Sequence, residues 1–197
     1  MNPRESCTYR ERMLRAATCQ PTDRPPVWLM RQAGRYLPEY HRVRGRGSFL
    51  EAVRNPQRAA EITIQPIQRF DMDAAVIFSD ILVPVAAMGY EVDFVAGRGP
   101  VIDPPIRDRA AIEKVRAFDP EADTGFLAES IQAVRAELGP DRAIIGFCGA
   151  PFTTASYMIE GGSSRNFEHT KALLYGATDD FVELIDRVVD ALVPYLG

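Results

Sequence analysis

The chain has 197 residues, of which 46% are hydrophobic and 25% charged, and its formal net charge is -4 at pH 7. Such a chain is long enough for one domain with a real core, and its acidic balance with only two lysines argues against nucleic acid as a partner. Because it has no run of about 18 apolar residues and its charged N-terminus lacks the apolar core of a signal peptide, the sequence predicts neither membrane insertion nor secretion and favours a cytoplasmic enzyme.

Basic and metal-ligating residue types are unevenly distributed. Residues 1–46 carry ten arginines against four acidic residues, so an anionic partner is expected to bind near this segment. The cysteines Cys7, Cys19 and Cys148 form no CxxC pair, and His41 and His169 lie in no metal-binding pattern. The sequence therefore predicts reduced thiols, no disulfide framework and no metal.

The N-terminal part predicts a helix followed by a buried strand. Residues Tyr9 to Thr18 have the spacing of an amphipathic helix whose apolar side carries Met13, Leu14 and Ala17. Val27 to Met30 form a continuous apolar run after two prolines, which is typical of a strand covered on both faces. We expect this run to be the first core strand.

Residues 42 to 88 predict a loop and then alternating helices and strands. Arg42 to Ser48 is a basic loop, either a solvated linker or a segment that closes over an anionic ligand. A helix over Pro56 to Phe70 contains Pro66, which should kink it or mark its last turns. The other elements expected in this stretch are a helix at Phe49 to Val53, a strand at Asp73 to Phe78 and a short helix at Ile81 to Met88.

The second half of the chain continues the alternation and adds a surface hairpin. The expected elements are a β-hairpin of Gly89 to Asp93 and Arg98 to Ile102, helices at Asp119 to Leu138, through Tyr157 to Gly161, at 167–176 and at 178–196, and a third core strand at Arg142 to Phe147. The glycines between residues 146 and 162 match neither a Walker loop nor a dinucleotide fingerprint. Buried strands alternating with helices predict a parallel α/β fold whose site lies at the carboxyl ends of the strands.

Two arginines follow the first apolar run at a spacing of four residues, Arg31 and Arg35. If Gln32 to Tyr36 turns as a helix, both guanidinium groups lie on one side, while Ala33 and Gly34 let backbone N–H groups approach a ligand. Two planar forks at this spacing suit a ligand with several anionic groups. The spacing alone does not decide between such a site and two solvated arginines.

Four sequence blocks favour the binding site by resemblance. MRQAGRYLPEY, FSDIL, GFCGAPFT and YMIEGG, in this order, resemble the uroporphyrinogen decarboxylase family, and IQPIQRF between them is also similar. The resemblance implies a (β/α)8 TIM barrel, of which residues 1–197 supply roughly the first half of the single domain, since only three core strands can be placed. It also implies a homodimer, no cofactor and uroporphyrinogen as the substrate.

The chemistry implied by the resemblance is the decarboxylation of the four acetate side chains of uroporphyrinogen III to the methyls of coproporphyrinogen III, in tetrapyrrole biosynthesis. Protonating the ring carbon beside an acetate makes an iminium that accepts the electrons of the breaking bond. The pyrrole is its own electron sink, so the protein must supply a proton, stabilise positive charge on the pyrrole nitrogens and anchor the carboxylates.

Asp80, within FSDIL, is the residue that the resemblance makes the charge stabiliser, because a carboxylate at a strand end can accept pyrrole N–H bonds. The alternative is a helix cap for the segment from Ile81 onward. Tyr157, within YMIEGG, would hydrogen-bond a carboxylate or orient Asp80, whereas a tyrosine on a helix face is more commonly a half-buried packing residue.

The remaining site residues are also carried by the resemblance. The predicted substrate-binding set is Arg31, Gln32, Ala33, Gly34, Arg35, Phe78, Asp80, Phe152 and Tyr157. The catalytic set contains Asp80, Tyr157 and Arg31. By resemblance, Arg31 would help to deliver the proton, although arginine is a poor acid. Phe78 and Phe152 would form apolar walls for the macrocycle, with core packing as the alternative, and the family's later serine and histidine have no counterpart in residues 1–197.

Two other functions stay open at this point. A cobalamin-dependent methyltransferase shares the barrel but binds zinc through ligands in its second half, and MRQAGRYLPEY with FSDIL favours the decarboxylase over it. A half-barrel that binds a tetrapyrrole or a partner without turnover is the other alternative. Product analysis separates that alternative from an enzyme, because a non-catalytic module returns its ligand with all carboxylates intact.

Overall fold

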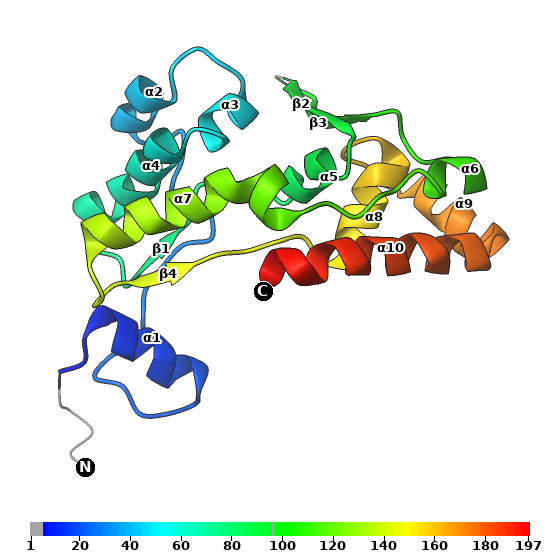
Figure 1. Ribbon diagram of the computed structural model, residues 1–197. Coiled ribbons are helices and arrows are strands. Elements are labelled where there is room, and N and C mark those ends of the chain that lie inside the picture. The colour runs from blue at the N-terminus through cyan, green and yellow to red at the C-terminus, as the bar shows by residue number, and fades with distance from the viewer. Residues whose placement is uncertain (1–5, 96) are drawn as a thin grey trace. The chain divides into compact units, whose positions relative to one another are not determined.

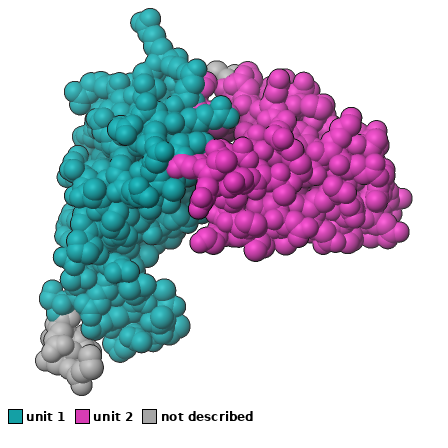
Figure 2. Space-filling model, viewed as in Figure 1, with its two compact units in different colours: residues 1–47, 51–79, 126–147 teal, residues 48–50, 80–125, 148–197 magenta. Residues whose placement is uncertain are grey.

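The computed structural model describes residues 6–95 and 97–197 (Figure 1), which form two compact units (Figure 2). Of the described residues, the first unit contains 6–47, 51–79 and 126–147, and the second contains 48–50, 80–95, 97–125 and 148–197. Residues 1–5 of the charged N-terminus, and Ala96 after the first hairpin strand, lie outside the described residues. Both units combine helices with short strands, as the predicted α/β class requires.

Most of the predicted elements are confirmed, with strands shorter than expected. The helices are α1 (Tyr9–Ala17), α2 (Pro38–Arg44), α3 (Phe49–Val53), α4 (Pro56–Phe70), α5 (Val83–Ala87), α6 (Arg109–Ile112), α7 (Pro120–Leu138), α8 (Pro151–Glu160), α9 (Glu168–Gly176) and α10 (Thr178–Leu196). The strands are β1 (Ala74–Val76), β2 (Glu91–Val95), β3 (Gly99–Asp103) and β4 (Ala143–Ile145).

The first unit is built on the parallel pair β1 and β4. Ala74 lies opposite Ala143 and Val76 opposite Ile145, so the two strands run in register over their whole length. A parallel pair needs a long crossover connection between its strands. The apolar residues of the two strands are covered by side chains of α4 and α7. The residues of this cluster are Ala60, Ile64, Ile67, Met72, Ala75, Ile77 and Val134.

Helix α4 shows how local sequence sets the bounds of an element. Asn55 caps its first turn by accepting the Arg58 N–H at 2.9 Å, and a proline occupies the first turn, where its missing N–H costs nothing. Pro66 lies inside the helix near its end, as predicted. The helix stops at Asp71, whose φ of 51° is left-handed and ends the hydrogen-bond ladder.

The prediction of a buried strand at Val27–Met30 is wrong. Val27 is 53% exposed and Met30 is 74% exposed, and the segment has no strand geometry. Asp73 N–H donates to the Val27 carbonyl at 2.8 Å, but the chain then turns, with Gln32 N–H donating to the Leu29 carbonyl at 3.1 Å. An apolar run becomes a strand only where another backbone segment runs beside it and shares its hydrogen bonds. Among the described residues, Val27 alone in this run has such a backbone partner.

Two further expectations in the first unit need correction. On α1 the buried residue is Arg12, at 5% exposure, whereas the predicted core residue Leu14 is 55% exposed. The apolar pattern failed because Arg12 is paired with carboxylates, which makes its burial tolerable. The basic loop predicted over residues 42–48 begins only after Arg44, since α2 extends to that residue and Gly45 ends it at a φ of 66°.

The second unit has an apolar core centred on α10. Its buried residues recur every three or four positions, which is the amphipathic pattern predicted for 178–196. They pack against apolar side chains of α5, α6 and α8 in one cluster. The α10 contributors are Phe181, Leu184, Val188, Ala191 and Leu192.

The glycines after α8 have a packing role. Gly161 ends α8 at a φ of 76°. A Cβ on Gly162 would lie 2.5 Å from the Pro100 carbonyl oxygen, because Gly162 forms a bridge with Val101 of the predicted hairpin, β2 and β3. Only glycine allows this close approach of two backbones. The structure thus explains these glycines without a phosphate loop.

Candidate functional site

The arginine loop, residues 27–36, carries the two predicted ligand-binding cations. Arg31 and Arg35 are both exposed, and neither guanidinium forms a hydrogen bond or ion pair with a residue in the described part of the chain. The loop runs through turns rather than through the helix considered for Gln32 to Tyr36. Both cations are therefore available to a ligand from one short segment.

Several other arginines of the first unit are engaged in ion pairs. They are Arg12, Arg15, Arg24, Arg69 and Arg142. An unpaired guanidinium fork is matched to a carboxylate or phosphate of a ligand. Arg46 also forms no hydrogen bond or ion pair within the described residues, so availability is a condition for ligand binding and not an identification by itself.

Gln32, predicted to line the ligand wall, has its side chain in the protein interior. It is 1% exposed, its Nε2 donates to the Ala74 carbonyl at 2.8 Å, and its Oε1 accepts from the Leu29 N–H at 3.0 Å. Ala33 and Gly34 are half-buried between the two arginines. The arginine loop thus exposes both guanidinium groups, while the side-chain amide of Gln32 bonds to the backbone at the start of β1.

Asp80 lies at the start of the second unit, three residues before the first residue of α5 (Val83). It is half-buried, its Oδ1 accepts the Leu82 N–H at 2.9 Å, and its carbonyl accepts the Val83 N–H at 3.2 Å. The helix starts at Val83 with Leu82 as its N-cap and has no side-chain cap bond, so the capping alternative is wrong, and the Asp80 side chain instead closes the turn that precedes α5. The hydrogen bonds of Asp80 are compatible with the catalytic role predicted for it, because an ionised carboxylate accepts several hydrogen bonds through its two oxygens.

Phe78 belongs to the first unit and is 6% exposed. Its ring lies 6.0 Å from the Tyr40 ring in an edge contact, and its N–H donates to Thr63 Oγ1 at 2.8 Å. This is the packing alternative considered for Phe78. Within the first unit, the structure therefore gives Phe78 a core role beside any role as a wall for a ligand.

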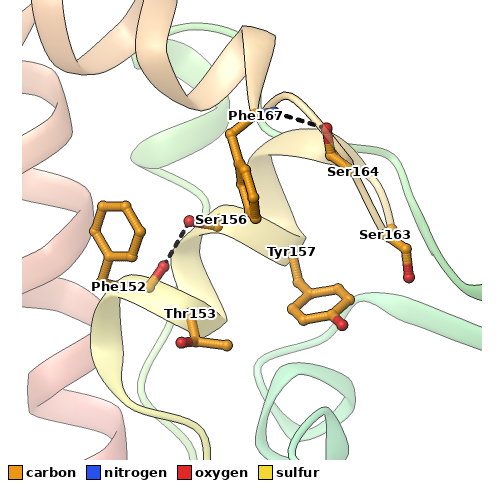
Figure 3. Close-up of a pocket in the computed structure, with 8 residues that line it drawn as sticks. Phe152, Thr153, Ser156, Tyr157, Ser163, Ser164 and Phe167 are labelled. Carbon is orange, nitrogen blue, oxygen red and sulfur yellow. Dashed lines mark hydrogen bonds between the residues drawn. The ribbon is translucent and has the colours of Figure 1, made fainter.

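Phe152 and Tyr157 line one pocket in the second unit, with a volume of about 250 Å³ (Figure 3). Phe152 is 52% exposed and its ring contacts Phe181 edge-on at 6.1 Å, while Tyr157 is half-buried. Figure 3 shows α8 on one side of the pocket and the segment after Gly162 on the other. The remaining lining residues are Thr153, Ser156, Gly162, Ser163, Ser164 and Phe167.

Sequence reasoning missed two groups of residues. The hydroxyl-bearing Ser163 and Ser164 follow directly after YMIEGG, so extending that block by two residues would have found them. The buried Arg12 and Asp73 gave no signal, because their burial depends on a contact between residues 61 positions apart. Charged residues on an apolar helix face are recognised as buried only when their partners are known.

The residues that the structure describes offer neither a metal centre nor a membrane-spanning helix. No group of three His, Cys, Asp or Glu side chains there is arranged to hold a metal ion, and no helix combines the length and apolar character needed to cross a membrane. Cys7, Cys19 and Cys148 form no disulfide with one another, and burial raises the pKa of Cys148.

Known proteins similar to this chain agree on one family. The model of the uroporphyrinogen decarboxylase (URO-D) family matches residues 8–197. Uroporphyrinogen decarboxylase of Myxococcus xanthus is 48% identical over 186 residues, covering 94% of this chain and 53% of that protein. Uroporphyrinogen decarboxylase of Streptomyces avermitilis is 47% identical over 191 residues, covering 97% of this chain and 53% of that protein.

A solved structure supports the fold. A methyltransferase from Methanosarcina mazei superimposes with a TM-score of 0.76 at 22% sequence identity, over 96% of this chain and 55% of that one. At this identity the likeness concerns the fold alone. The chain spans about half the length of the curated relatives it matches. The family match over nearly all its residues shows that this chain belongs to the uroporphyrinogen decarboxylase family.

Proposed function

We propose that this chain is the N-terminal portion of a uroporphyrinogen decarboxylase, a carboxy-lyase that converts the four acetates of uroporphyrinogen III to methyls without a cofactor. The observation that carries the proposal is the family match along residues 8–197. The product would be coproporphyrinogen III, in tetrapyrrole biosynthesis. The protein's work would be to bind the carboxylates, stabilise a cationic pyrrole and supply a proton.

The residue roles follow from the chemistry of each group. Arg31 and Arg35 would bind substrate carboxylates, which the exposed and unpaired state of both guanidinium groups supports. Arg31 would also assist proton delivery. Asp80 would accept pyrrole N–H bonds and stabilise the positive charge that forms on protonation, and Tyr157 would hydrogen-bond a carboxylate or orient Asp80.

The remaining predicted residues would shape the binding surface. Ala33 and Gly34 would line it through their backbone, and Phe78 and Phe152 would face the macrocycle with apolar rings. The exposure of Phe152 beside a pocket supports its part in this role.

The architecture that goes with this function is a (β/α)8 barrel, with residues 1–197 in roughly the first half of one domain. The parallel pairing of β1 with β4, covered by apolar residues of α4 and α7, supports it. We further propose a homodimer in the cytoplasm with uroporphyrinogen as the ligand.

The test is anaerobic incubation of protein purified from its own cells with uroporphyrinogen III, followed by chromatographic separation of products by number of carboxylates. The mass of that protein is measured first, with peptides from residues 27–35 confirming its identity. Stepwise appearance of products with seven to four carboxylates is expected. Recovery of the substrate with all eight carboxylates would replace the enzyme by the non-catalytic binding alternative.

Asp80→Asn provides the sharper test, because it keeps a hydrogen-bond acceptor for Leu82 N–H but removes the charge. We expect turnover to fall by about 100-fold or more, in the range found for removing one electrostatic stabiliser. Asp108→Asn is the matched control, since Asp108 is another carboxylate of the second unit that accepts a backbone N–H at a helix start. Undiminished turnover by Asp80→Asn would remove Asp80 from the mechanism.

A further inference from the structure

Two side chains fasten the arginine loop to consecutive residues of the first unit. Asp73 accepts the Val27 N–H on Oδ2 at 2.7 Å and donates its own N–H to the Val27 carbonyl at 2.8 Å. Gln32 bonds the Leu29 N–H and the Ala74 carbonyl through its buried amide. The backbone on both sides of Trp28 to Arg31 is therefore tied to the start of β1.

Asp73 is itself held in place by buried charges. Its side chain is fully buried and receives bonds from Arg12 Nη1 at 2.5 Å and from Arg24 Nη1 at 2.6 Å. The Arg12 side chain is 6% exposed and also donates twice to Asp23, at 2.6 and 2.7 Å, and once to the Cys7 carbonyl. Every charge in this network has hydrogen-bonded partners, so the network favours one arrangement of its side chains. The backbone of Val27 is held in place by that arrangement, because it bonds to Asp73.

The other end of the loop is also fixed. The Tyr36 hydroxyl donates to the Gln32 carbonyl at 2.5 Å, and His41 Nε2 donates to the Arg35 carbonyl at 2.8 Å. A tyrosine hydroxyl, with an ordinary pKa of about 10, keeps its proton for this bond at neutral pH, and partial desolvation raises the pKa of Tyr36 further. Arg31 and Arg35 thus project from a backbone held on either side of them, while their guanidinium groups stay exposed.

A fixed backbone matters because arginine side chains are costly to order. Immobilising a long side chain or a loop on binding reduces affinity, and the part already ordered in the free protein no longer contributes to that cost. Bidentate recognition of a carboxylate also requires that the planar fork be aimed correctly. A loop fixed at Val27, Gln32 and Arg35 would lower the cost of ordering and improve the aim.

We propose that Gln32 and Asp73 are positioning residues, which set the backbone of the arginine loop so that Arg31 and Arg35 reach the carboxylates of one ligand. Their side chains act through the loop and do not touch the ligand. This differs from the sequence-based prediction, which placed Gln32 in the ligand wall. The inference rests on the proposed function, since the ligand is taken to be a carboxylated tetrapyrrole.

The experiment is a double-mutant cycle with uroporphyrin III as the probe, its binding followed by porphyrin fluorescence. Gln32→Met keeps the length and volume of the side chain but removes both hydrogen bonds. In the wild-type background we expect affinity to fall about tenfold, the order expected when side chains must be newly ordered on binding. In the Arg31→Ala, Arg35→Ala background the same change should alter affinity by less than about twofold, because the groups it positions are gone.

Asp73→Asn is the second variant in the same cycle, and we expect the same pattern: a clear loss of affinity in the wild-type background and little change in the Arg31→Ala, Arg35→Ala background. If Asp73→Asn does not fold, the result for Gln32→Met decides whether the positioning role holds. Ser130→Ala is the control, because it removes a buried hydroxyl bond to the Phe126 carbonyl elsewhere in the first unit. Its affinity should stay within about twofold of wild type. An equal loss in both backgrounds, or a tenfold loss in Ser130→Ala, would overturn the positioning role.

The arms of the cycle separate failure of this inference from failure of the proposed function. If Arg31→Ala, Arg35→Ala binds uroporphyrin III as tightly as wild type, the arginine pair is not the ligand site and both proposals are wrong. If that variant binds weakly but Gln32→Met binds normally, the ligand site stands and only the positioning role is wrong.

Discussion

The two units of this chain are stabilised by different interactions. In the first unit, buried charges on Arg12 and Asp73 connect α1, the arginine loop and the start of β1. In the second unit, an apolar cluster joins α10 to α5, α6 and α8. Charge-assisted hydrogen bonds fix the direction of the backbone, but they are lost when one partner is removed or its carboxylate is protonated. Apolar packing does not depend on pH, but it is weakened when a core side chain is truncated. Fixing a ligand-binding loop and filling a core therefore call for different chemistry.

Acidification should have the largest effect and should act first on the first unit. The Arg12 hydrogen bond holds the pKa of Asp23 below its ordinary value. Burial alone would raise the pKa of Asp73, but bonds from Arg24, the Val27 N–H and Arg12 bring it below that value. Carboxylates with a lowered folded-state pKa stabilise the fold fully above the unfolded pKa near 4, and that stabilisation is lost as the pH falls through the folded pKa.

The measurement uses Trp28, the single tryptophan, which lies in the arginine loop of the first unit. As the pH is lowered below about 4, we expect its fluorescence to change before far-UV circular dichroism reports loss of the helices. Glu160 of the second unit also has a lowered pKa, since bonds from Thr170 outweigh its burial, so the second unit is not wholly insensitive. Coincident transitions would remove the contrast between the units.

Asp73→Asn should be the most damaging single substitution in the first unit. It removes the charge that partners the buried Arg12, and breaking one side of a buried ion pair costs about 3–5 kcal/mol. The measurement is urea unfolding followed by Trp28 fluorescence. Asp71→Asn is the control, because Asp71 is 67% exposed in its pair with Arg142 and should cost no more than about 1 kcal/mol. Similar losses for the two variants would contradict the buried network.

Leu184→Ala tests the apolar core of the second unit. Leu184 is fully buried, and truncating such a leucine costs about 2–5 kcal/mol through lost transfer energy and the cavity left behind. Urea unfolding followed by far-UV circular dichroism measures this loss. Leu196→Ala, at an exposed position of the same helix, should stay within about 0.5 kcal/mol of wild type. A loss below 1 kcal/mol for Leu184→Ala would mean that α10 is not central to this core.

Thr8→Ala should give the smallest effect and sharpens the comparison within the first unit. Thr8 Oγ1 accepts the Glu11 N–H at 3.2 Å at the start of α1, the helix that carries Arg12. Loss of an N-cap costs about 1 kcal/mol, and Thr8→Ser should restore it. Urea unfolding by Trp28 fluorescence provides the measurement. A loss as large as that of Asp73→Asn would show that α1 itself, rather than the charge network, holds the first unit together.

Helices were predicted well because their signals are local. The cap at Asn55, the proline in the first turn of α4 and the apolar stripe of α10 all lie within one turn or one face of the helix concerned. The hairpin of β2 and β3 was predicted for the same reason. The prediction failed at Val27–Met30, where an apolar run says only that the residues are apolar, while burial depends on what covers them.

By itself, the sequence determined the family, the candidate site residues and the order of most elements, because caps, periodicity and sequence blocks are read from neighbouring residues, whereas it placed a strand at Val27–Met30 that does not form and did not predict α2 and α6. The tertiary structure alone decided that Arg12 rather than Leu14 is buried on α1 and that the Gln32 amide points inward to the Ala74 carbonyl. Both depend on partners far along the chain, and burying a polar group is tolerable only when its hydrogen-bond partners are in place.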